Sequence, residues 1–320
     1  MSLVWVIGSG GLLGQALISE LSNSPVDLFD PGVKFNWGNQ NKVCEQLRQA
    51  ALHFCTKAAH RPWTIYWVAG IGNMHSLEED LQEETHVLER FISTLLQMVD
   101  LPLNLGTFIF ASSAGAIYAG IQKGVITEST PPAPINAYGR IKLVQESLIN
   151  TLNKNSHGAR VITCRISTIY GFKNITGKQQ GLLSEIARRI ISNQVIHIYV
   201  PLETMRDFIT AKDAANKMIC TTQQFEKIPG VYLKIIASEA SISIAQILAI
   251  FKRICKRKLR VVTQADLRSA QYQRVVQFKS EIAIVNENIN RTNIVEGIAD
   301  LLAAIREDVT KHRNQSSRGH

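Results

Sequence analysis

The chain has 320 residues and a mass of 35.6 kDa, and 45% of its residues are hydrophobic while 19% are charged. This length and composition supply a large apolar core, which excludes a disordered protein and a coiled coil. No stretch approaches the roughly 20 uninterrupted apolar residues that a membrane helix requires. The net charge of +9 suits nucleic acid and a phosphate-bearing small molecule equally, so charge alone does not select a partner.

The start of the chain and its cysteines indicate the compartment. Met1 to Leu17 is apolar, but it has no basic n-region and glycines interrupt it, so we expect no secretory signal peptide. The five cysteines are scattered and form no CxxC pair, which disfavours a disulfide framework and a structural zinc site. The histidines have no metal-ligand spacing, so we predict no metal. Together these features favour a cytoplasmic protein.

The N-terminal half alternates apolar segments typical of strands with amphipathic segments typical of helices. In chain order we predict strand 3–7, helix 12–21, strand 26–29, helix 42–59, strand 64–68, helix 79–98, strand 107–111, helix 137–152 and strand 160–166. This alternation indicates right-handed βαβ crossovers and a parallel sheet with helices on both faces. We therefore predict an α/β fold with a Rossmann-type, doubly wound sheet in an NAD-binding domain over residues 1–171.

After Gly171 the pattern becomes less regular. A helix is expected over 182–193 and a short strand over 195–200, followed by mixed helix and strand. Residues 172–320 are predicted to form mainly a smaller α+β substrate-binding domain, with a segment around 205–236 returning to the sheet. Such a domain would lie over the carboxyl ends of the strands, where open α/β folds bind their ligands.

A glycine-rich turn lies directly between the first predicted strand and the first predicted helix. Gly8, Gly11 and Gly14 have the spacing G-x-x-G-x-x-G. Gly8 permits a tight turn, Gly11 lets the backbone approach a pyrophosphate, and Gly14 lets the helix pack close to the sheet. The free N–H groups and the dipole of the helix N-terminus then stabilise the phosphates. A plain turn is the alternative, but the placement between strand and helix favours a dinucleotide site.

Asp30 closes the second predicted strand, 22 residues after Gly8. A carboxylate at this position accepts hydrogen bonds from both hydroxyls of the adenosine ribose and repels a 2′-phosphate, so NAD is favoured over NADP. The alternative is simple turn chemistry in Asp30-Pro31-Gly32. Lys34, which lies nearby, leaves NADP open.

Tyr138-Gly-Arg-Ile-Lys142 opens a predicted helix and places the tyrosine and the lysine on one face at i,i+4. A phenol with a pKa of about 10 is a poor base at neutral pH, but a neighbouring ammonium favours the phenolate. Lys142 can also donate to a nicotinamide ribose. Ser112-Ser113 ends a strand 25 residues earlier, where a hydroxyl can hydrogen-bond a substrate while Tyr138 exchanges its proton. The alternatives are a half-buried tyrosine with a solvated lysine, and serines that only end a strand.

The chain resembles an extended short-chain dehydrogenase/reductase of the NAD-dependent epimerase/dehydratase family, which acts mainly on nucleotide sugars. The similarity runs over nearly the whole length and includes six segments in order. They are Gly8-x-x-Gly11-x-x-Gly14, Phe108-Ile-Phe-Ala-Ser-Ser113 with Ile117-Tyr118, Tyr138-Gly-Arg-Ile-Lys142, Arg165-Ile-Ser-Thr-Ile-Tyr-Gly171, Arg206-Asp-Phe-Ile-Thr-Ala-Lys-Asp213 and Arg291-Thr-Asn-Ile-Val-Glu-Gly297.

The resemblance assigns a set of residues to the cofactor. Those implied to line the pyrophosphate are Gly8, Gly11, Leu12, Leu13 and Gly14. Asp30 would bind the adenosine ribose, and Ala69 and Gly70 would end the fourth strand beside the cofactor. Tyr138 and Lys142 would lie at its nicotinamide end.

The resemblance also implies a catalytic trio of Ser113, Tyr138 and Lys142, in which Ser113 would contact the substrate as well. Arg206 matches the arginine that commonly approaches the diphosphate of the substrate nucleotide in this family. Arg274 is a weaker candidate for the same task, because its surroundings match poorly. A surface ion pair is the alternative for either arginine.

Several positions depart from the family pattern. The serine or threonine usual four residues before Tyr118 is Ala114, so Ser113, at five residues, is preferred. The Asp-Glu pair of sugar dehydratases is absent, because Ala114-Gly115 stands there, which counts against 4,6-dehydration. The family commonly has an asparagine near the substrate nucleotide, and Thr168 stands at that position here. Thr168 is therefore our candidate substrate-binding residue. The usual asparagine of the preceding helix is replaced by Glu84-Thr85.

We therefore predict an NAD-dependent nucleotide-sugar epimerase that acts at C4 through a 4-keto sugar, with Tyr138 as acid and base. The first alternative is an NAD(P)H-dependent reductase of a keto-sugar or another carbonyl compound, with the same trio. The second is a non-catalytic dinucleotide-binding or nucleic-acid-associated protein, since Lys252 to Arg260 holds six basic residues in nine. That stretch has no interleaved aromatics for base stacking, so we expect a solvated face and no nucleic-acid or membrane partner. Apolar faces around 79–98 and 137–152 permit a homodimer.

Overall fold

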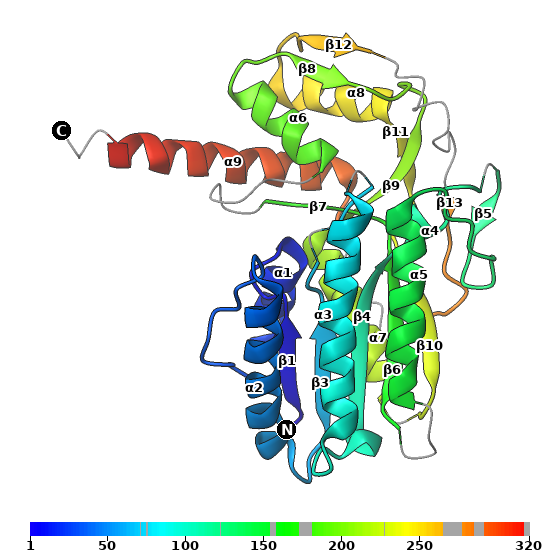
Figure 1. Ribbon diagram of the computed structural model, residues 1–320. Coiled ribbons are helices and arrows are strands. Elements are labelled where there is room, and N and C mark those ends of the chain that lie inside the picture. Colours follow the sequence, from blue (N-terminus) through cyan, green and yellow to red (C-terminus); the bar gives the residue numbers. More distant parts are fainter. Residues whose placement is uncertain are drawn as a thin grey trace.

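The computed structural model describes residues 1–70, 72–74, 76–121, 123–153, 158–172, 181–226, 228–264, 277–284 and 291–316. These residues form a six-stranded parallel sheet in the order β10-β6-β4-β3-β1-β2 (Figure 1). Its strands are β1 (Leu3–Ile7), β2 (Asp27–Leu28), β3 (Trp63–Trp67), β4 (Gly106–Ser113), β6 (Arg160–Ile166) and β10 (Val231–Ile236). The predicted doubly wound parallel sheet is confirmed.

The resemblance is wrong in the ordinal that it gives to one strand, although the predicted strand over 64–68 was already the third in the chain. Ala69 and Gly70 follow β3, the third strand of the chain, and not a fourth. No strand lies between β2 and the next helix in residues 29–39, all of which are described, so β2 is the edge strand. The physical reason is local: Asp30-Pro31-Gly32 forms a turn at the point where β2 would continue, and Pro31 has no N–H for a ladder.

Helices cover both faces of the sheet. On one face lie α1 (Leu12–Leu21) and α7 (Ala211–Phe225), and on the other lie α2 (Gln40–Ala58), α3 (Glu78–Gln97) and α5 (Ala137–Ile149). Strand β1 shows how the sequence builds both cores, since alternate residues of a strand point to opposite faces. Trp5 packs with α2 and α3, whereas Val4 and Val6 pack with α1 and α7.

A smaller α+β part lies beyond the carboxyl ends of the parallel strands (Figure 1). One small sheet has the order β11-β9-β7, and β12 pairs with β8 in another. The bounds are β7 (Thr168–Tyr170), α6 (Leu182–Ile191), β8 (Ile196–Ile198), β9 (Met205–Thr210), β11 (Ser241–Ser243), α8 (Ile244–Cys255), β12 (Val261–Thr263) and α9 (Ile294–Ser316). Ile186, Phe251 and Leu302 belong to its separate apolar core.

The chain crosses between the two parts more than once. After β9 it returns through α7 and β10, and β10 extends the large sheet beside β6. Short elements complete the described chain: η1 (Leu103–Leu105), α4 (Ala114–Ile117), β5 (Val125–Ile126), η2 (Asn150–Asn153) and β13 (Gln277–Phe278). Among the helices that the structure describes, none has the length and apolar character needed to cross a membrane.

Candidate active site

The glycine turn packs tightly between the first and third strands. Gly8 has a φ of +96°, and a Cβ atom there would lie 2.5 Å from the backbone nitrogen of Ala69. At Gly14 a Cβ atom would lie 2.2 Å from the Gly8 carbonyl oxygen. Any larger side chain would therefore separate α1 from the turn. Gly11 donates its N–H to the same carbonyl at 2.9 Å.

The N-terminus of α1 is suited to an anion. Its N-cap residue, Gly11, provides no side chain to accept hydrogen bonds, and the first turn contains no acidic residue. The N–H groups and the positive end of the helix dipole are therefore left to an external acceptor such as phosphate. The sheet order reverses at β1, between β2 and β3, which is the crevice where open α/β sheets bind ligands. The turn thus fits the pyrophosphate of NAD.

Asp30 lies at the outer end of this crevice, after the edge strand β2. Its side chain is exposed, and Oδ1 accepts a hydrogen bond from the Gly32 N–H at 2.8 Å. The turn chemistry considered as the alternative for Asp30 is therefore observed. That contact occupies one oxygen of an exposed carboxylate, which remains compatible with a ribose partner. Lys34 is exposed on the same loop.

Ser113, Tyr138 and Lys142 are brought together from two elements. Asn136 caps α5 by accepting the Gly139 N–H at 2.8 Å, which fixes the first turn that carries Tyr138. The Lys142 Nζ lies 5.6 Å from the centre of the Tyr138 ring, and Lys142 is 4% exposed. Ser113 ends β4 and hydrogen-bonds Tyr138.

The two adjacent serines have different partners, because successive side chains of a strand point in opposite directions. The Ser112 hydroxyl is buried and donates to Glu146 at 2.6 Å. Ser113, by contrast, caps the short helix α4 and faces Tyr138. Of the two hydroxyls, that of Ser113 is the one within reach of the phenol.

The phenol of Tyr138 rests in its neutral form. Burial raises its pKa above the ordinary value, and the negative charge of Glu84 raises it further. The ammonium of Lys142 and the hydrogen bond with Ser113 act in the opposite direction but do not outweigh burial. Burial alone would lower the pKa of Lys142. The charge that Tyr138 carries once it ionises and the charge of Glu84 outweigh that effect, so the pKa of Lys142 is raised and Lys142 is an ammonium.

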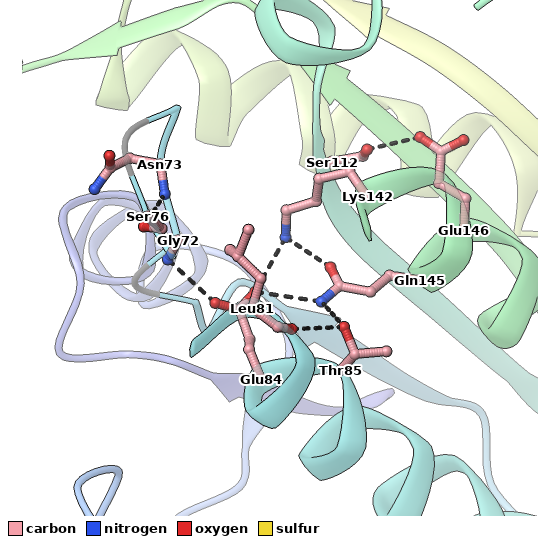
Figure 2. Close-up of polar contacts among 10 residues, drawn as sticks. All are labelled: Gly72, Asn73, Ser76, Leu81, Glu84, Thr85, Ser112, Lys142, Gln145 and Glu146. Carbon is pink, nitrogen blue, oxygen red and sulfur yellow. Dashed lines mark hydrogen bonds and ion pairs between the residues drawn. The ribbon is translucent and has the colours of Figure 1, made fainter. Parts of the chain in front are cut away.

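A polar network joins α5 to α3 behind the trio (Figure 2). Lys142 Nζ donates to Gln145 Oε1 at 2.9 Å and pairs with Glu84 Oε1 at 3.3 Å. Gln145 Nε2 donates to the Thr85 hydroxyl at 3.0 Å. Glu84 Oε2 accepts the Gly72 N–H at 3.2 Å, which links the network to the segment after β3. Glu84 therefore places a carboxylate beside Lys142. The family pattern described above has an asparagine, and so an amide, in about this place on the helix.

A second buried network holds the other side of α5. Arg165 on β6 donates to both oxygens of Glu146, at 3.0 and 2.6 Å, and to the Tyr118 hydroxyl at 2.6 Å. The side chains of Arg165 and Glu146 are 7% and 10% exposed. Since Glu146 is one turn beyond Lys142, this network fixes the helix that carries Tyr138 and Lys142.

The predicted substrate residues fall in two places. Thr168 on β7 pairs with Phe208 on β9, two residues from Arg206, so Thr168 and Arg206 lie in one small sheet beyond the carboxyl ends of the large one. Arg206 pairs in turn with Ile242 on β11. Arg274 lies outside the described residues. Ala114 and Gly115 form the first turn of α4, directly after Ser113.

Sequence reasoning missed three contributors to the site: Gly72, Gln145 and Glu146. Gln145 is one turn after Lys142 on the helix face that carries it, and this spacing was a usable signal. A Cβ atom on Gly72 would lie 3.1 Å from the Tyr138 ring, a contact that no sequence pattern indicates. Arg165 is a charged residue inside an apolar strand, and a buried charge requires a partner of opposite charge. This was the available signal for Glu146.

Two further features concern other ligands. Within the described ranges no group of three or more His, Cys, Asp or Glu residues is arranged to hold a metal ion. The basic residues between Lys252 and Arg260 are exposed at the end of α8 and just after it, as expected for a solvated face.

The sequence matches the profile of the NAD dependent epimerase/dehydratase family over residues 4–233, so the chain belongs to that family. The predicted family, the predicted enzyme class and the NAD cofactor are thereby confirmed.

The individual relatives and solved structures reported next have low sequence identity to this chain. The dTDP-4-dehydro-6-deoxyglucose reductase of Escherichia coli is 25% identical over 69% of this chain and 72% of its own length. Among solved structures, MoeE5 in complex with UDP-glucuronic acid and NAD has a TM-score of 0.76 at 18% identity, covering 96% of this chain and 99% of that one. The Thermus thermophilus UDP-glucose 4-epimerase in complex with NAD has a TM-score of 0.71 at 16% identity, covering 95% and 99%. These structures share the fold.

Proposed function

We propose that this chain is an NAD-dependent nucleotide-sugar epimerase that works at C4 of the sugar through a transient 4-keto intermediate. The observation that carries the proposal is the cluster of Ser113, Tyr138 and Lys142 at the carboxyl edge of the sheet that carries the glycine turn. Two proteins of the same fold are described with a UDP sugar or as a UDP-glucose epimerase, each with NAD. A UDP sugar is therefore the first substrate class to test.

Each residue has a distinct task in this proposal. Gly8, Gly11 and Gly14 with Leu12 and Leu13 hold the pyrophosphate against the N-terminus of α1. Asp30 binds the adenosine ribose, and Ala69 and Gly70 line the cofactor after β3. Arg206 binds the diphosphate of the substrate and Thr168 lies near its nucleotide, while Arg274, outside the described residues, is the weaker candidate for the diphosphate.

The chemistry requires a proton and a hydride to leave the same C4–OH group. NAD, when bound, accepts the hydride and later returns it. The Tyr138 phenolate takes the hydroxyl proton while Ser113 hydrogen-bonds the same oxygen, which leaves a 4-keto sugar. After rotation of the sugar, Tyr138 would return the proton to the same oxygen, and the bound cofactor would supply the hydride to the opposite face, which would invert the centre. Lys142 assists because its ammonium stabilises the phenolate.

A reductase that uses the same residues is the second candidate. The resting state of Tyr138 favours it, because a neutral phenol is ready to donate a proton to a carbonyl oxygen. The E. coli relative is itself named as a reductase of a keto sugar. An epimerase keeps its cofactor through the cycle, whereas a reductase must exchange it.

Mass spectrometry of small molecules released by acid denaturation of the freshly purified protein separates these candidates. Near-stoichiometric NAD is the expected result for the epimerase, and a co-released nucleotide sugar would identify the substrate class. A protein that is empty but binds NADH or NADPH on titration would support the reductase instead. Failure to bind either dinucleotide would refute both enzyme proposals.

We also propose that α3 and α5 pair between two copies of the chain. Leu96 on α3 and Val144 on α5 are 45% and 52% exposed, so each of these two helices presents an apolar side chain to solvent. Sedimentation equilibrium at several protein concentrations is expected to give a dimer, and Val144→Glu is expected to give a monomer. A wild-type chain that remains monomeric would refute this arrangement.

A further inference from the structure

Glu84 is a buried carboxylate at the centre of the site, and the roles assigned above do not use it. Its Oε1 pairs with Lys142 Nζ at 3.3 Å, and its Oε2 accepts the Gly72 N–H at 3.2 Å (Figure 2). A Cβ atom on Gly70 would lie 2.9 Å from Glu84 Oε1. The carboxylate therefore lies between the lysine of the trio and the segment that follows β3. Its side chain is 13% exposed and that of Lys142 is 5% exposed.

A purely structural role explains these contacts poorly. The Gln145–Thr85 hydrogen bond, at 3.0 Å, already joins α5 to α3. Gln145 Oε1 is also the nearer acceptor for Lys142, at 2.9 Å. Burying two charges costs desolvation energy, so an ion pair such as Lys142–Glu84 adds little to stability. What Glu84 contributes beyond a neutral acceptor is its charge.

Among the described residues, that charge acts on titratable groups carried by α5. Lys142 and Tyr138 face Glu84 from α5, and Ser113 reaches the phenol from β4. Glu146, the other carboxylate that acts on Lys142, is paired with Arg165. In a buried site an ammonium favours a nearby phenolate, and a carboxylate beside both opposes it.

We propose that Glu84 is a positioning residue of this site, whose carboxylate holds the Lys142 ammonium and offsets part of its effect on Tyr138, and so acts together with burial to keep Tyr138 a neutral proton donor. The inference concerns the active site of the proposed function and rests on that function for its catalytic meaning. It predicts that positive charge brought to the site is needed before Tyr138 becomes a base. Burial places the pKa of Tyr138 above its ordinary value. The Lys142 ammonium lowers that pKa, and the Glu84 carboxylate acts against the ammonium, as the proposal requires.

The test follows the ionisation of Tyr138 directly, with no substrate. Near-ultraviolet absorbance of tyrosinate is recorded against pH for the full chain, and the signal missing from Tyr138→Phe is assigned to Tyr138. Glu84→Gln keeps the shape and a hydrogen-bond acceptor but removes the charge. At a pH at the foot of the wild-type transition, where little tyrosinate has formed, the tyrosinate fraction of Tyr138 is expected to be at least about threefold higher than in the wild type.

Three further variants make the result interpretable. Glu83→Gln removes the same charge from an exposed neighbour on α3 and is expected to titrate like the wild type. Glu84→Asp keeps the charge and is expected to restore most of the wild-type behaviour. If Glu84→Gln does not fold, Gln145→Glu adds a carboxylate next to Lys142 and is expected to move ionisation to higher pH.

The proposal is overturned if Glu84→Gln or, in its place, Gln145→Glu titrates like the wild type, or if Glu83→Gln shifts as much as Glu84→Gln. This readout is independent of the reaction catalysed, so loss of the epimerase proposal would not affect it. Once a substrate is identified, the pH profile of kcat is expected to move in the same direction as the absorbance.

Discussion

Replacing Arg165 by Met tests whether the buried network behind α5 stabilises the fold. The variant removes three hydrogen bonds and leaves the Glu146 carboxylate, whose side chain is 10% exposed, with Ser112 as its remaining donor. Removing one partner of a buried ion pair costs about 3–5 kcal/mol, because the other charge stays buried and uncompensated. For a chain of this size about 2 °C of melting temperature corresponds to 1 kcal/mol, so we expect a fall of about 6–10 °C.

Differential scanning calorimetry of the full chain measures this shift, with Arg48→Met as the matched control. Arg48 pairs with Glu45 at 2.8 Å, but the two side chains are 46% and 57% exposed. An exposed pair contributes about 0–1 kcal/mol, so the control should melt within about 2 °C of the wild type. The double variant that also carries Glu146→Met should recover part of the loss. If Arg165→Met melts like Arg48→Met, the reasoning is refuted.

Tyr138→Phe is expected to lower kcat at least about a hundredfold and to keep dinucleotide binding, because only the proton-transfer group is lost. Turnover within about tenfold of the wild type would remove Tyr138 from the mechanism. Gly14→Ala should weaken NAD binding at least about tenfold in fluorescence titrations, since its Cβ would lie 2.2 Å from a backbone oxygen. Gly38→Ala, whose Cβ has ordinary contacts, should bind like the wild type. Burial raises the pKa of the Cys164 thiol to about 12, so it stays protonated at pH 7. Mass spectrometry of maleimide adducts should therefore show Cys220 labelled before Cys164, and the reverse order would contradict this.

Most of the central sheet was predictable because its signals are local. Leu3–Ile7 is a continuous apolar run typical of a strand buried on both faces, and Arg160–Ile166 is mainly apolar between its two arginines. The predicted bounds of both strands agree with the structure. The helix over Leu12–Leu21 agrees as well. The strand before Ala69 was also predicted, over 64–68, as the third in the chain; only the ordinal that the resemblance gave it, a fourth strand, was wrong.

The candidate site was predictable to the extent that its residues follow one another at regular spacing. Tyr138 and Lys142 are i,i+4 on one helix, and the glycines of the turn are three apart. Glu84 was noted only as a departure from the family pattern. Its contact with Lys142 spans 58 positions of sequence, and no periodicity connects residues that far apart.

The sequence by itself determined the parallel α/β class, the dinucleotide turn and the tyrosine–lysine pair, because each depends on residue types within one or two neighbouring elements. Only the tertiary structure decided that Ser112 is held by Glu146 and which carboxylates flank Lys142. Those contacts depend on how α3, α5 and β4 pack against one another. The charge state of the site follows from that packing, since burial and the distance between charges set the pKa of a phenol and the strength of an ion pair.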